Sequence, residues 1–104
     1  MRVSPGRRDN RYATRMDVTV PARLREIGST ERFDVLIEDM SLTGFCCSTS
    51  FDLNVGQAVA ITMPGLASLE ARVAWAQHYR YGCEFNRALH VAVLDHIVRQ
   101  HRKA

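Results

Sequence analysis

The strongest constraint on the fold is an alternation of apolar and polar residues that recurs along most of the chain. The clearest case begins at Val18, where Val, Val, Ala and Leu occupy every second position up to Leu24. Alternation with a period of two is typical of a β-strand with one buried face. Runs that predict short strands cover residues 18–24, 33–38, 44–50, 58–63, 69–75 and 81–85.

The spacing changes to a helical period from Ala88 onward. An apolar stripe recurs at three- and four-residue intervals, and its members are Val91, Leu94, Ile97 and Val98. Six short antiparallel strands at regular spacing, followed by one helix, predict an all-β fold. We expect a closed or nearly closed six-stranded barrel with the C-terminal α-helix covering an open end.

Two details refine the predicted strands. Pro21 has no N–H to donate, so the first strand should lie at an edge or carry a bulge there. In the fifth strand, the alternation places Trp75 on the same face as Ala71 and Val73.

The second and third strands are joined by a polar corner, residues 38–45. Within it, Asp39, Ser41 and Gly44 have the spacing D-x-S-x-x-G. They provide a carboxylate acceptor, a hydroxyl that donates or accepts, and a glycine that allows positive φ or close approach of another group. Because these are also ordinary turn residues, the corner alone is compatible with a simple turn or a binding site.

Positive charge is concentrated in residues 1–15, which hold five arginines against one aspartate, a balance of +4. Arg11 and Arg15 have the spacing R-x-x-x-R just before the first strand, and Arg7 and Arg8 lie further out. Guanidinium groups bind phosphate, stack on bases and pair with guanine O6 and N7. Residues 1–15 are therefore predicted to form a flexible basic arm, and residues 16–104 the barrel with its helix. A solvated tail or a nonspecific nucleic-acid arm would have the same composition.

Other classes of function are disfavoured. The sequence has no G-x-S-x-G, H-E-x-x-H or phosphate-binding glycine loop, so we expect no enzyme and no cofactor. The histidines lack metal-ligand spacing and are expected to be ordinary surface or half-buried residues: His78, His90, His96 and His101. The cysteines should be small, buried, unpaired residues, with the adjacent pair facing opposite sides of a strand: Cys46, Cys47 and Cys83. No metal site is expected.

The sequence also bears on the cellular location of the protein. No apolar run approaches the roughly 20 residues that span a bilayer, and the basic N-terminus lacks the apolar region of a signal peptide. We therefore expect a cytoplasmic protein without membrane insertion. Binding of DNA or RNA is not expected, because the strands show no basic stripe with interleaved aromatic residues.

The order of these motifs resembles that of the PilZ domain family, small bacterial receptors for cyclic di-GMP. The resemblance covers nearly the whole chain. It is carried by R-x-x-x-R before the strand V-x-V-P-A-R-L, by D-x-S-x-x-G at the expected distance, and by three later strand segments. These segments are Gly56-Gln-Ala-Val-Ala-Ile, Ala71-Arg-Val-Ala-Trp75 and Tyr81-Gly-Cys-Glu-Phe85.

The resemblance implies a mechanism. Arg11 and Arg15 would grip phosphate and the guanine O6/N7 edge, while Asp39 and Ser41 would meet a guanine's donor edge and Gly44 would keep the corner open. The arm would fold over the ligand and change the surface that an unidentified downstream protein partner meets.

Two features of the sequence depart from the family pattern. Asn10 stands where the family often has another arginine, which affects how many ligand molecules bind. Arg7 and Arg8 also permit the register Arg7-x-x-x-Arg11; we prefer Arg11 and Arg15 because they adjoin the strand. The alternative function is a PilZ-like protein–protein adaptor that binds no nucleotide.

Overall fold

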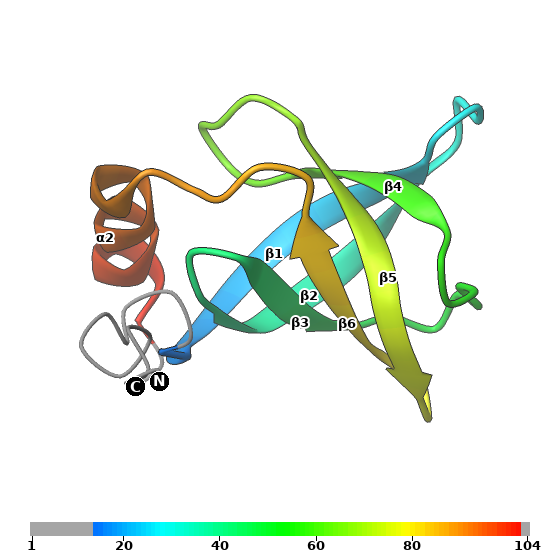
Figure 1. Ribbon diagram of the computed structural model, residues 1–104, viewed down its shortest axis with the longest axis horizontal. Helices are drawn as coiled ribbons and strands as arrows, with labels where there is room; N and C mark the ends of the chain where they lie inside the picture. The colour runs from blue at the N-terminus through cyan, green and yellow to red at the C-terminus, as the bar shows by residue number, and fades with distance from the viewer. Residues whose placement is uncertain (1–13, 103–104) are drawn as a thin grey trace, which may run out of the picture.

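The computed structural model describes residues 14–102 and shows six strands wound into a closed barrel, with one helix beside it (Figure 1). The elements are β1 (Met16–Glu26), β2 (Arg32–Met40), β3 (Gly44–Ser48), β4 (Ala58–Thr62), β5 (Leu69–Gln77), β6 (Arg80–Phe85) and α2 (Val91–His101). The predicted fold class is confirmed. The helix begins at Val91, three residues later than the sequence suggested, because His90 provides its N-cap.

The strands follow one another around the barrel in the order β1-β2-β3-β6-β5-β4, and each neighbouring pair is antiparallel. Pairing of β1 with β4 closes the ring. The alternating apolar residues fill its interior, and several are fully buried: Val20, Leu24, Ile37, Phe45, Cys47, Val59 and Ile61. This interior is the hydrophobic core that holds the corner and the outer face in place.

Strand β1 has different neighbours along its length. Its pairing with β4 covers only Arg23–Glu26, so the part that contains Pro21 pairs with β2 alone. A register shift between Asp17 and Val20 adds a bulge to the same part. The expectation that Pro21 marks an edge or a bulged region is therefore confirmed, and the missing N–H disturbs no pairing with β4.

Helix α2 lies beside the first part of β1, where β4 is absent (Figure 1). Its buried residues Leu94, Ile97 and Val98 join the barrel core, and a bridge between Val18 and Arg102 fixes its C-terminal end to β1. Within residues 14–102, no helix combines the length and apolar character that crossing a membrane requires.

The start of α2 is capped by a histidine side chain. The His90 Nδ1 accepts a hydrogen bond from the Ala92 N–H at 3.0 Å. Side-chain caps of this kind contribute about 0.5–2 kcal/mol, so we expect His90→Ala to lower the free energy of unfolding by that amount. Urea denaturation measures it. His96→Ala, at an exposed position of the same helix, is the control, and an equal loss in both variants would contradict the capping role.

The predicted orientation of Trp75 is wrong. The register between β5 and β6 shifts between Val73 and Trp75, and this bulge turns the indole to the outside of the barrel, where it is 41% exposed. The indole covers Gly82 so closely that a Cβ on Gly82 would overlap it. Trp75 is therefore a feature of the outer face and not of the core.

Candidate functional site

The corner between β2 and β3 is held from inside by Ser41. Its N–H donates to the Gly44 carbonyl at 2.9 Å, and its Oγ accepts a hydrogen bond from the Thr43 N–H at 3.2 Å. The Ser41 residue is only 3% exposed. The hydroxyl thus fixes the turn, and the predicted contact of Ser41 with a ligand stays a prediction.

Gly44 allows two strands to approach each other. It is the first residue of β3, its φ is not positive, and a Cβ placed on it would overlap the backbone carbonyl of Cys83 in β6. Of the two roles that the sequence left open for this glycine, close approach is the one that the structure shows.

Asp39 lies on the outer side of β2 and contacts the first motif. The Arg15 Nη1 lies 3.0 Å from the Asp39 Oδ1, with the two side chains 48% and 25% exposed. Ion pairs as open as this contribute little stability, about 0–1 kcal/mol. One arginine of R-x-x-x-R and the carboxylate of D-x-S-x-x-G are therefore neighbours that a competing anion can separate at low cost.

The other arginines of the basic arm, Arg7, Arg8 and Arg11, lie outside the described residues. The same holds for the predicted flexibility of residues 1–13. Of the arginines predicted to bind the ligand, Arg15 is the one that the structure places.

Sequence reasoning missed a second ion pair beside Asp39. A register shift between Ile37 and Asp39 makes a bulge in β2, which brings Glu38 to the same outer side as Asp39. The Arg80 guanidinium binds Glu38, with Nη2 2.9 Å from Oε1. Hydrogen bonding to Glu38 raises the pKa of Arg80. These residues are distant in sequence, so only the pairing of β2, β3 and β6 could reveal the cluster.

A row of residues crosses the outer face from Asp39 to Trp75. Asp39 is paired in register with Cys46, Cys46 with Gly82, and Gly82 with Trp75. We call these four residues the outer row. Its two central residues, a cysteine and a glycine, are small and buried, and the indole lies over Gly82.

The centre of the outer row is also uncharged. Cys46 is 3% exposed, and the Arg80 Nη2 lies 3.6 Å from its Sγ. Burial, with a smaller contribution from the negative charge of Asp39, raises the pKa of the Cys46 thiol and keeps it protonated. Cys46, Cys47 and Cys83 are free and buried, as predicted, and Cys47 points into the core instead.

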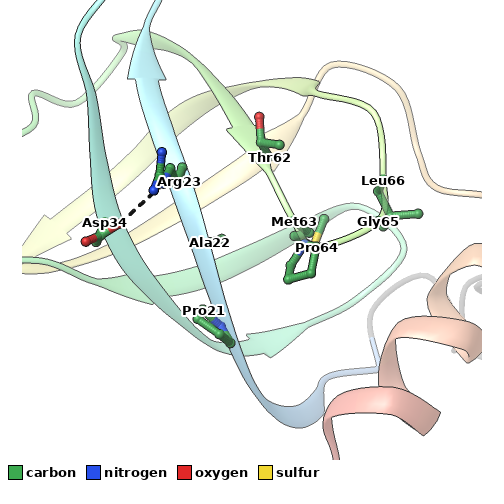
Figure 2. A pocket seen from close by; sticks show the side chains of 9 residues that line it. All are labelled: Pro21, Ala22, Arg23, Asp34, Thr62, Met63, Pro64, Gly65 and Leu66. Atoms are coloured by element: carbon green, nitrogen blue, oxygen red, sulfur yellow. Dashed lines mark ion pairs between the residues drawn. The ribbon is translucent and has the colours of Figure 1, made fainter.

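Two hollows on the surface of residues 14–102 lie away from these residues. Figure 2 shows a groove between β1 and the turn after β4, with the Arg23–Asp34 ion pair of 3.6 Å on its rim. A neighbouring hollow continues from this turn toward α2. Neither is lined by Arg15 or by the residues of D-x-S-x-x-G. The Arg15–Asp39 pair lies outside both hollows, on an exposed part of the described surface.

The arrangement brings charged and aromatic groups together on the outer face. In the part of the chain that the structure describes, no three His, Cys, Asp or Glu side chains are grouped so that they could hold a metal ion. The chemical groups at the site are two carboxylates, two guanidinium groups and an indole. These bind charged and planar groups through hydrogen bonds and stacking.

Comparison with known proteins identifies the fold and the family. The family model of the PilZ domain matches residues 7–101. Among solved structures, the chain is similar to the PilZ domain of CeSA from a cellulose-synthesizing bacterium, with a TM-score of 0.61 and 20% sequence identity. That likeness covers 84% of this chain and 93% of the other, and at this identity it shows the shared fold. No curated protein matches the chain. Because the family model spans nearly the whole sequence, the chain belongs to the PilZ domain family.

Proposed function

We propose that this protein is a single-domain cytoplasmic receptor that binds cyclic di-GMP and relays the signal to a partner protein. PilZ domains are generally receptors for this dinucleotide and act by binding rather than by catalysis. The observation that carries the proposal is the Arg15–Asp39 contact of 3.0 Å, which brings the two motifs together on one open face.

The two charged groups match the two kinds of group on the ligand. A phosphate or the O6/N7 edge of a guanine takes the Arg15 guanidinium, and the N1–H and N2–H₂ edge of a guanine donates to the Asp39 carboxylate. In the free protein each group holds the other in place through an exposed ion pair. Binding therefore replaces a weak contact with two charge-assisted ones.

The outer row offers an aromatic ring to a planar base. The Trp75 indole lies over Gly82 and is itself 41% exposed. Guanine has a broad flat face that can stack on such a ring. Ser41 and Gly44 support the outer row by fixing the corner behind it.

The basic arm supplies the cover that the open face lacks. Arg11, with Arg7 and Arg8, adds guanidinium groups that fold over the bound dianion, and the arm's balance of +4 speeds the encounter. Ordering of the arm changes the surface that a partner meets. This is how the proposed receptor passes on its signal.

Calorimetric titration with cyclic di-GMP tests the proposal, with GTP and linear diguanylate as controls. We expect saturable binding of the cyclic dinucleotide, and the stoichiometry will show whether one or two molecules bind when Asn10 replaces an arginine. Trp75 is the single tryptophan, so its fluorescence provides a second readout. Absence of both heat and a fluorescence change would reject the receptor and leave the adaptor.

A further inference from the structure

We propose that helix α2 reports the state of the corner, because main-chain hydrogen bonds join the two. The Leu42 carbonyl accepts from the Leu89 N–H at 2.8 Å, and the Thr43 carbonyl accepts from the Phe85 N–H at 2.8 Å. Leu89 directly precedes the N-cap of α2. The segment that leads from β6 into the helix is thus bonded to two consecutive residues of the corner.

The contact is buried, which strengthens it. Leu42 is 2% exposed and Leu89 is 9% exposed, and both belong to the hydrophobic core. Water cannot readily replace these hydrogen bonds, so a shift of the corner must either move the start of α2 or leave buried polar groups unpaired.

The other end of α2 is fixed to β1, the strand that follows Arg15. The bridge between Val18 and Arg102 joins the end of the helix to β1, three residues after Arg15. One end of the helix is therefore attached behind Asp39, and the other lies close along the chain to its partner Arg15. A ligand that separates Arg15 from Asp39 acts on both attachments.

Ser41 connects the exposed carboxylate to the buried carbonyls. It stands two residues after Asp39, and its Oγ accepts from the Thr43 N–H at 3.2 Å, which sets the direction of the peptide group that joins Leu42 to Thr43. A change at Asp39 therefore reaches Leu89 and Phe85 through one rigid turn. Thermodynamic linkage makes the effect reciprocal. If bound ligand changes the opening equilibrium of α2 by some factor, opening of α2 changes the affinity for the ligand by the same factor.

Amide hydrogen exchange of α2 in the Ser41→Ala variant tests the link without ligand. The chain offers a matched control, because Ser29 makes the same bond in the β1–β2 turn: its Oγ accepts from the Glu31 N–H at 3.1 Å. This turn lies at the far end of the barrel from α2 (Figure 1). Loss of one such bond should raise exchange at the start of α2 by about two- to tenfold in Ser41→Ala, and leave it unchanged in Ser29→Ala.

Amides of β4 distinguish a local effect from a global one. Faster exchange in α2 that exceeds any change in β4 supports the link. Equal changes in α2 and β4, or equal behaviour of the two serine variants, would overturn it.

The second part of the test adds cyclic di-GMP to the unaltered protein, and this part rests on the proposed function. Bound ligand should change the exchange of α2 amides relative to those of β4. Binding seen by calorimetry without any change in the exchange of α2 amides would overturn the proposal that α2 responds to the state of the corner. Absence of binding would reject the receptor instead, while the comparison of Ser41→Ala with Ser29→Ala would still decide whether the corner and the helix are linked.

Discussion

Gly44→Ala is expected to lower the free energy of unfolding by about 3 kcal/mol, enough to leave a marginally stable barrel partly unfolded. The new Cβ would overlap the carbonyl of Cys83, and both strands that meet there are held in the barrel by pairs on each side. A backbone carbonyl cannot rotate away as a flexible side chain can. Relief therefore requires β3 and β6 to separate, which breaks their pairing.

Gly65→Ala is the matched control for this variant. Gly65 has φ +77 but no atom within contact distance of an added Cβ, so alanine there causes backbone strain without overlap. Such strain costs roughly 1–2 kcal/mol. Urea denaturation of both variants separates the two effects, and a loss in Gly44→Ala no larger than in Gly65→Ala would show that β3 and β6 tolerate the added methyl group.

Arg15→Ala and Asp39→Ala are each expected to weaken cyclic di-GMP binding at least about tenfold, as is Arg11→Ala. A hydrogen bond to a charged group is worth about 1.5–3 kcal/mol, which corresponds to this loss or more. Stability should change by less than about 1 kcal/mol in the first two variants, because the Arg15–Asp39 pair is exposed. Calorimetry gives the affinities, and urea denaturation confirms that the barrel is intact.

Arg23→Ala provides the control for nonspecific charge. Arg23 lies in β1 and pairs with Asp34 of β2 at 3.6 Å, so its removal deletes another exposed ion pair, away from the corner. Binding should be nearly unaffected. If Arg23→Ala bound cyclic di-GMP as weakly as Arg15→Ala does, the affinity would depend on net charge alone. Unchanged affinity in both Arg15→Ala and Asp39→Ala would refute the site.

The sequence predicted the elements well because alternation is a local property. A strand with one face in the core must repeat every two residues, and β1 does so clearly. Trp75 was misplaced because a bulge adds one residue to one strand, and an extra residue reverses every side chain that follows it. The local sequence Ala-Trp-Ala does not indicate this reversal.

The site was predictable only in part. The residue types at Asp39 and Arg15 indicated charge recognition, and the structure brings these two together. The pair formed by Glu38 and Arg80 could not be foreseen, since it depends on which strands are neighbours around the ring. The sequence likewise shows that Ser41 carries a hydroxyl. Its burial and its hydrogen bond to the Thr43 N–H could not be predicted, because they depend on the folded turn.

The order of strands around the barrel also governs how fast the chain can fold. β3 pairs with β6 and β1 with β4, so the ring closes only when segments far apart along the chain meet. Chains dominated by such distant pairings fold in milliseconds to seconds, whereas helical proteins of similar size fold in microseconds to milliseconds. Stopped-flow refolding followed through Trp75 should therefore be slow, with the hairpin of β5 and β6 forming long before the ring has closed.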